Sequence, residues 1–240
     1  MEPFILAFFG LGYLVLGGAD IGVGMLLPYL GRSPRERREV IAAIAPFFLG
    51  NEVWLVATVG VLAGLFPIVE GELLSGNYVA VVALLGSWIL RDMALWLRGR
   101  VPGRGWQLLW DGVLVAGSWG LAVSLGLVLA GTVLDMPLLA GLVIALIFAL
   151  HGLAFASLRL SGTLRRRAGA LLGGTGEWPA YALTASAIAV IAVVSGLHLD
   201  LSTAGSMITP VILAIIPFLV AAQAWVWWTF RGRVTGPSYL

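Results

Sequence analysis

The stretch GGADIGVGMLLPYLGRSPRERREVIAAIAPFFLGNEVW, residues 17–54, places two acidic residues inside long apolar runs. Asp20 falls in the first run and Glu52 in the second, and a charged turn separates the two runs. Carboxylates are costly at bilayer depth, so in membrane helices they are rare and usually face a bundle interior or a hydrated path. The stretch therefore predicts two membrane-spanning helices, and its two carboxylates are the first candidates for function.

The charged turn within this stretch carries the signals of a helix start. Ser33 is a preferred N-cap residue, Pro34 suits the first helical position, and Glu36 stands three residues after the cap. This pattern predicts that the second helix begins here. It also predicts a tight hairpin between the first two spans.

Four glycines stand in pairs at four-residue spacing on the same two runs: Gly18 and Gly22, and Gly60 and Gly64. Small residues at this spacing let two membrane helices approach closely. We therefore expect the helix faces that carry Asp20 and Glu52 to pack against protein.

The composition excludes an ordinary soluble domain. Hydrophobic residues make up 60% of the 240 residues and charged residues 11%, and the mean hydropathy is +1.01, whereas soluble domains have about 25% charged residues. A membrane span needs about 20 apolar residues, so the chain has room for about seven spans. The predicted fold class is an all-α polytopic membrane protein.

Hydrophobic runs between arginine-rich and Pro/Gly breaks predict seven spans: 3–27, 39–65, 77–97, 107–131, 137–159, 178–198 and 207–230. All 14 basic residues are arginine, and they cluster after the first, third, fifth and seventh spans. The positive-inside rule then places the N-terminus outside and the C-terminus in the cytoplasm. The first ten residues contain no basic residue, so we expect the first helix to be retained. The longest cytoplasmic connection, 160–177, is expected to be a loop.

The residue types present limit the chemistry. The chain has no cysteine, which excludes disulfides and thiolate ligands. Its two histidines, His151 and His198, would lie roughly 20 Å apart along the membrane normal, so they cannot hold one haem iron between them. We expect no metal or haem bound by this chain alone. Arginines confined to short loops give no support to nucleic-acid binding.

Several blocks of sequence carry a family resemblance. The Gly-x-Asp-x-Gly-Val-Gly run at 18–24, the LPYLGR block at 27–32 and the APFFLGNEVW block at 45–54 resemble subunit II of the cytochrome bd-type quinol oxidases. GWQLLWD at 105–111 and WVWWTFRGRV at 225–234 are similar to later parts of the same family. The chain is identified as a shortened or divergent member.

The resemblance is uneven along the chain. We expect a single transmembrane domain with a family-like four-helix part at 1–131, a less family-like part at 132–206 and a family-like last helix at 207–240. Leu49 stands where many family members have an acid just before the Gly-Asn pair. At this position the chain lacks the carboxyl group to which the resemblance attaches a proton or haem-stabilising role.

The resemblance implies a function within a complex. The chain would be the haem-free subunit II of a quinol:oxygen oxidoreductase of aerobic respiration, without catalytic residues of its own. It would bind a larger subunit I that carries haem b and haem d, in the plasma membrane, with quinol as substrate and with membrane lipids and quinone around it.

Within this chain, Asp20 and Glu52 are the candidate proton pathway. Chains of carboxylates serve as proton relays in membranes, and oxygen reduction consumes protons. Helical rise places Asp20 about 10 Å from the cytoplasmic end of its helix and Glu52 near the midplane of the next. Asn51 and Trp54 are expected to support this site.

Further polar residues are expected to have structural roles. Arg91 and Asp92 are adjacent and point about 100° apart on a helix, so we expect them not to pair with one another. Arg91 is predicted to bond Asp111 or Asp20 and to lock helices together. Trp110 and Asp111 are expected at the cytoplasmic interface, where tryptophan is favoured.

Two other functions remain open at this level. The chain could be a scaffold that stabilises subunit I and conducts nothing, in which case Asp20 and Glu52 would only hold helices together. It could also be a secondary transporter, against which stand the odd number of spans and the lack of an inverted repeat.

Overall fold

The computed structural model describes residues 1–130, 136–202 and 207–236. In these residues the chain forms helices with short connections, and the order is α1 (Glu2–Met25), α2 (Leu27–Leu30), α3 (Pro34–Leu65), α4 (Pro67–Gly76), α5 (Tyr78–Leu97), α6 (Arg104–Ala130), α7 (Pro137–Arg159), α8 (Gly162–Gly169), α9 (Glu177–Gly196) and α10 (Thr209–Thr229). Seven of them are long and apolar enough to cross a membrane: α1, α3, α5, α6, α7, α9 and α10. The prediction of an all-α protein with seven spans is confirmed.

The predicted span boundaries agree with the helix ends to within a few residues, except at the start of α3. This helix begins at Pro34, before the predicted span 39–65 but at the start that the capping signals predict. Residue 131, the last of the fourth predicted span, lies outside the described residues. The expectation of a loop over 160–177 is wrong in part, because α8 forms there. Its buried Leu164 and Ala168 are four residues apart, so one apolar side packs on the bundle while the arginines stay outside.

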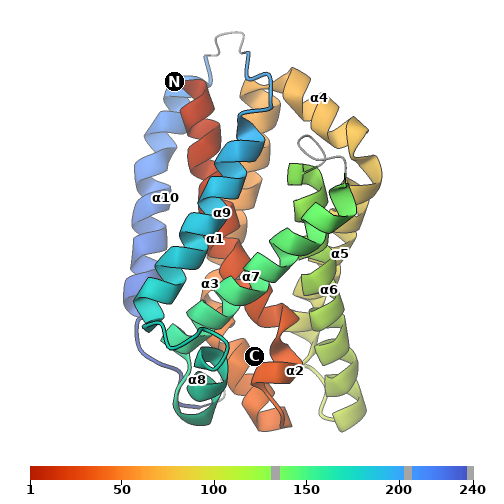
Figure 1. The fold of residues 1–240 in the computed structure, drawn as a ribbon, viewed down its shortest axis with the longest axis vertical. Coiled ribbons are helices and arrows are strands. Elements are labelled where there is room, and N and C mark those ends of the chain that lie inside the picture. The colour runs from red at the N-terminus through yellow and green to blue at the C-terminus, as the bar shows by residue number, and fades with distance from the viewer. Residues whose placement is uncertain (131–135, 203–206, 237–240) are drawn as a thin grey trace.

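The long helices run along the long axis of the molecule, with α2 and α8 at one end and α4 at the other (Figure 1). We call the end with α2, α8, the start of α3 and residues 231–236 the arginine-rich end. Helix α1 contacts α3, α6, α7 and α9. It therefore lies at the centre of the bundle and carries Asp20 into it.

The approach of α1 to α7 depends on glycine. A Cβ atom at Gly22 would lie 1.9 Å from the main-chain oxygen of Phe148, and one at Gly152 would lie 2.3 Å from the main-chain carbon of Gly22. The two backbones are thus in direct contact, as the glycine spacing on the first helix predicts. At Gly60 such a Cβ would meet no atom of the described residues within 4 Å, so packing of this face against protein stays a prediction.

Polar contacts fasten the arginine-rich end. Ser33 and Glu36 form the predicted capping box at the start of α3. Arg167 of α8 donates to Glu36 Oε2 at 2.9 Å and to the main-chain oxygen of Leu30 at 2.8 Å. These contacts fix α8 against the α2–α3 turn.

The chain after α10 returns to the end of α7. The main-chain nitrogen of Val234 donates to the oxygen of Arg159 at 2.8 Å, and Ser161 Oγ donates to the oxygen of Val234 at 2.9 Å. Arg159 Nη1 donates to the oxygen of Gly232 at 2.7 Å. Residues 232–234 therefore lie against the α7–α8 connection.

Candidate functional site

One arginine in the bundle interior meets three carboxyl groups from three helices. Arg91 of α5 is 1% exposed, and its Nη2 atom contacts Asp20 of α1. Its Nη1 atom lies 3.1 Å from Asp92 Oδ1 of α5 and 3.6 Å from Glu52 Oε1 of α3. We call these four residues the Arg91 cluster. A buried charge needs a paired partner, and the cluster supplies it for Asp20.

A chain of amide contacts holds Asp20 in place. Asn51 Nδ2 donates to Asp20 Oδ2 at 2.6 Å and to the main-chain oxygen of Leu16 at 3.0 Å. Asn51 Oδ1 accepts from Gln223 Nε2 at 3.1 Å, and Gln223 Oε1 accepts from Trp54 Nε1 at 3.2 Å. The chain joins α1, α3 and α10, so each polar atom named here has a partner although it lies in an apolar surrounding.

Glu52 lies at the edge of the cluster. Its side chain is 15% exposed, compared with 3% for Asp20, and Trp88 Nε1 donates to its Oε1 at 3.0 Å. A cavity of about 10 Å³ lies between Glu52, Asp20 and Tyr13. This volume is at the lower limit for one water molecule. Within the site, the side chain of Asp20 is therefore buried, and the side chain of Glu52 is partly exposed.

A second ionic group lies toward the arginine-rich end. Asp111 of α6 accepts from Arg98 Nε and, at 3.4 Å, from Arg98 Nη2, and it lies 3.0 Å from Arg37 Nη1. We call these three residues the Asp111 group. Trp110 does not join it, since its ring packs on Trp106 at 5.6 Å between centroids and its indole nitrogen has no hydrogen-bond partner in the described part of the chain.

One unpaired hydroxyl lies between the two groups. Ser118 of α6 is fully buried, and its Oγ has no hydrogen-bond partner among the residues that the structure describes. A Cβ at Gly24 would lie 2.3 Å from this oxygen, so the hydroxyl rests directly on α1. By helical rise, Gly24 lies about 6 Å from Asp20 along α1, toward the arginine-rich end. Ser118 lies about 10 Å from Asp111 along α6, away from that end. Ser118 therefore lies at a level between those of Asp111 and Asp20 along the bundle.

The structure brings five of the predicted site residues into direct contact: Asp20, Asn51, Glu52, Arg91 and Asp92. Trp54 joins them through Gln223. Of the two partners predicted for Arg91, Asp20 is the one found. The prediction that Arg91 and Asp92 do not pair is wrong, because the guanidinium lies at the end of a flexible stem that turns back to its neighbour.

Three residues of the site were not predicted as part of it: Trp88, Gln223 and Tyr13. Trp88 stands four residues before Asp92, a spacing that puts both on one helix face and could have indicated its role. Gln223 is an amide within an otherwise apolar run of α10, which is also a signal. Tyr13 is two turns before Asp20 on α1, and nothing in the sequence distinguishes it from other aromatic residues of the core.

The histidine in the bundle is not arranged as a haem ligand. His151 Nδ1 is 2.7 Å from Thr184 Oγ1 and Nε2 is 2.9 Å from the main-chain oxygen of Val15, so both ring nitrogens are engaged. His198 is exposed at the far end of α9. Within the described residues, no group of three or more His, Cys, Asp and Glu side chains is arranged to hold a metal ion.

The fold and the cluster define a multi-pass α-helical membrane protein with an ion-paired polar centre. Comparison with known proteins gives the family. The sequence-family model of cytochrome bd terminal oxidase subunit II matches residues 3–233, so the chain belongs to this family. The match includes residues from all three parts expected from the sequence, which are 1–131, 132–206 and 207–240. That the chain divides into these parts stays a prediction.

Characterised relatives agree with this family. Cytochrome bd ubiquinol oxidase subunit 2 of Bacillus subtilis is 34% identical over 176 residues, which cover 65% of this chain and 52% of the relative. Cytochrome bd-I ubiquinol oxidase subunit 2 of Escherichia coli is 35% identical over 127 residues, which cover 53% of this chain and 34% of the relative. The chain thus spans about half, or less, of the length of the relatives that it matches.

Proposed function

We propose that this chain is the haem-free subunit II of a cytochrome bd-type quinol:oxygen oxidoreductase in the plasma membrane. It binds a haem-bearing subunit I, the site of quinol oxidation and oxygen reduction, and gives cytoplasmic protons access to the membrane interior. The family and the names of its relatives support the complex. The observation that carries the proton role is the Arg91 cluster, because it concentrates ionisable groups in the bundle interior.

The charge balance of the cluster suits proton exchange. One guanidinium faces three carboxyl groups, from Asp20, Glu52 and Asp92. Full ionisation would leave two negative charges without a cation in a medium of low dielectric constant. The cluster can therefore hold a proton on one of its carboxyl groups and release it, and the proposed route passes this proton from Asp20 to Glu52.

The polar residues also supply a direction. Apart from Arg91, the arginines flank the helix ends at the arginine-rich end of the bundle, and by the positive-inside rule we take this to be the cytoplasmic end, with the N-terminus outside. From there the Asp111 group, Ser118 and Asp20 follow one another into the bundle, and Glu52 is the last carboxyl group. Water molecules bridge the gaps between these groups in this proposal, since the separations exceed hydrogen-bond length.

Glu52 opens toward a face that suits subunit I. Leu49, Val53 and Val56 of α3 are exposed beside it and form an apolar surface. Leu49 occupies the position where the family resemblance leads one to expect an acid, and Glu52 stands three residues later, almost one helical turn. We infer that Glu52 provides the carboxyl group on this face.

Replacement of Asp20 by asparagine tests the proposal. Asn has nearly the same shape and keeps a polar contact with Arg91, but it does not exchange a proton. In the purified two-subunit complex we expect quinol-dependent oxygen consumption to fall at least about tenfold while haem content per complex is unchanged. The matched control is Glu72→Gln, an exposed acid on α4 at the opposite end, which should retain full activity.

The results separate the proposals. Purification of the tagged chain in mild detergent should yield haem absorbance and a larger membrane subunit; a colourless chain purified alone, from cells that make the partner, would overturn the oxidase assignment. If the complex forms and Asp20→Asn keeps full oxygen consumption, the chain is a scaffold. That second candidate is favoured by Leu49 and by the complete pairing of Asp20 in the cluster.

A further inference from the structure

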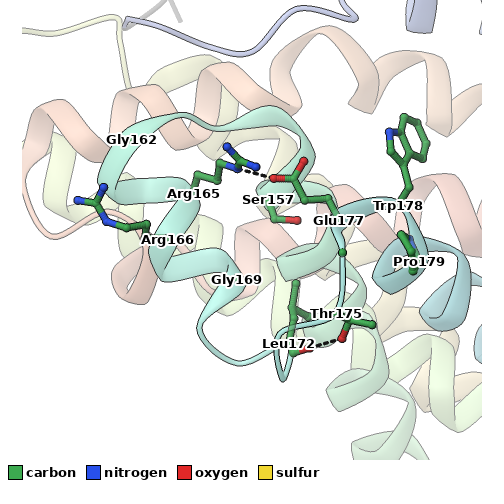
Figure 2. A pocket seen from close by; sticks show the side chains of 11 residues that line it. Ser157, Gly162, Arg165, Arg166, Gly169, Leu172, Thr175, Glu177, Trp178 and Pro179 are labelled. Atoms are coloured by element: carbon green, nitrogen blue, oxygen red, sulfur yellow. Dashed lines mark hydrogen bonds and ion pairs between the residues drawn. The ribbon is translucent and has the colours of Figure 1, made fainter.

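A pocket of about 640 Å³ opens at the arginine-rich end, between α8 and the start of α9 (Figure 2). Ser157 at the end of α7 lies at its base, and Arg165, Arg166, Leu172, Glu177 and Trp178 are among the residues that line it. A volume in this range accommodates a small molecule or a lipid headgroup. The pocket is separate from the Arg91 cluster, which does not share any lining residue with it.

The pocket carries an excess of positive charge. Figure 2 shows Arg165 of α8 and Glu177 of α9 joined by an ion pair, through Arg165 Nε. Arg233 of the tail donates to the other oxygen of Glu177 at 2.6 Å. Glu177 is therefore shared by two arginines, and Arg166 has no carboxylate partner at all among the described residues. Three guanidinium groups against one carboxylate leave a net charge of two positive units.

The arginines that line the pocket keep free donors. Arg165 uses Nε for Glu177, and neither of its Nη groups has a partner in residues 1–130, 136–202 and 207–236; its side chain is 50% exposed. Arg166 uses one Nη atom for a bond of 3.1 Å to Thr163 Oγ1. Guanidinium groups with unused Nη donors bind phosphate oxygens with two parallel hydrogen bonds.

The rim of the pocket is apolar and lies at the level of the membrane surface. Helix α9 is one of the membrane-spanning helices and begins at Glu177, so the pocket sits where this helix enters the bilayer. Trp178, which is 64% exposed, and Leu172 line the pocket together with the arginines. Tryptophan at such a position prefers the boundary between headgroups and acyl chains. A ligand that contacts both the arginines and the apolar rim of the pocket needs an anionic head and an apolar tail.

We propose that this pocket binds the phosphate headgroup of an anionic membrane phospholipid. The phosphodiester accepts from the free Nη donors of the arginines that line the pocket, Arg165 and Arg166, and the acyl chains run along Trp178 and Leu172. Basic pockets between membrane helices at the cytoplasmic surface recognise such headgroups. The bound lipid joins α8 to α9 beside the Glu177 contact. The proposal does not depend on proton transfer through the Arg91 cluster.

The test is native mass spectrometry of the full chain, purified in mild detergent with any subunit that copurifies, delipidated and titrated with phosphatidylglycerol. The variant Arg165→Gln/Arg166→Gln is compared with Arg100→Gln/Arg104→Gln, which removes the same charge from exposed arginines outside the pocket. We expect one tightly bound lipid in the wild type, at least about tenfold weaker binding in the pocket variant, and binding within about twofold of wild type in the control.

Two further measurements guard against a trivial result. Arg166→Gln alone leaves the Glu177 contact intact, so it preserves the fold of this region and should still weaken lipid binding severalfold. Phosphatidylcholine, which has the phosphate but no net charge, should bind more weakly than phosphatidylglycerol by about tenfold.

Three outcomes would overturn the proposal. Equal lipid binding by the pocket variant and the control would show that the arginines bind no headgroup. Equal affinity for phosphatidylcholine and phosphatidylglycerol would remove the selectivity for anionic lipids. Displacement of the lipid by millimolar inorganic phosphate, with phosphate itself retained by the wild type and lost in the pocket variant, would make the pocket a site for free phosphate instead.

Discussion

Arg91 is the residue on which the interior charges depend. Arg91 is the cation in contact with Asp20, and it also contacts the carboxyl groups of Glu52 and Asp92. Loss of Arg91 would therefore leave Asp20 buried and uncompensated, but loss of Asp20 would leave Arg91 with two carboxyl partners. The two positions should respond differently to substitution.

We expect Arg91→Gln to lower the free energy of unfolding by about 3–5 kcal/mol, the usual cost of a buried charge that has lost its partner. Asp20→Asn should cost clearly less. The thermal unfolding midpoint of the purified complex measures both. In the double variant Asp20→Asn/Arg91→Gln the loss should be smaller than in Arg91→Gln alone; strictly additive losses would argue against the pair.

At the residue scale, the sequence predicts which side chains matter better than it predicts how they join. Asp20, Glu52 and Arg91 stand out because charges in apolar runs are rare. Their meeting point depends on how α1, α3 and α5 rotate and cross, which no local pattern specifies. The contact of Arg91 with Asp92 was missed because adjacent helix positions diverge at Cβ, whereas the bond forms at the end of a long side chain.

Helix α1 and helix α7 pack through glycine, and this contact can be tested directly. Gly152→Ala would place a methyl group 2.3 Å from the backbone of Gly22, so the helices must separate. We expect a loss of about 1–3 kcal/mol in unfolding free energy. The control Gly86→Ala on α5 meets no atom within 4 Å and should change the stability little. Equal effects of the two substitutions would contradict the close contact.

The start of α3 gives a second test at this scale. Ser33 Oγ accepts from the main-chain nitrogen of Glu36 at 3.2 Å, and Glu36 Oε2 accepts from that of Ser33 at 3.1 Å. Ser33→Ala should cost about 1 kcal/mol, as for other N-cap replacements. The exposed Ser75→Ala serves as the control and should be neutral. The thermal midpoint of the purified protein distinguishes the two.

Elements with strong patterns were predicted well, and short ones were not. Long apolar runs bounded by arginine specify the seven spans, and the capping box specifies the start of α3. Helix α8 is too short and too polar to be recognised from its sequence, and it forms because Leu164 and Ala168 find cover on the bundle. Tertiary contacts rather than local preference stabilise it.

The orientation of the whole molecule is testable because the chain contains no cysteine. Single cysteines can therefore be introduced without background. In intact cells we expect a membrane-impermeant maleimide to label a Ser75→Cys variant, near the end of α4. An Ala170→Cys variant, just after α8, should be labelled only after permeabilisation. Labelling with the opposite sidedness would reverse the proposed topology and the proposed direction of proton entry.

The partly open position of Glu52 has a consequence for assembly. If no other protein covers the exposed apolar face of α3 in the membrane, the partly exposed carboxyl group of Glu52 faces lipid there. Lipid tails offer it no hydrogen bond, whereas a partner with a polar group at this level would. In the isolated subunit, the exposed part of the Glu52 carboxyl group therefore lacks a polar partner on the lipid side. In the proposed complex, pairing with such a partner would relieve this penalty, so the carboxyl group that ends the proposed proton route would also favour a matching partner over bare membrane.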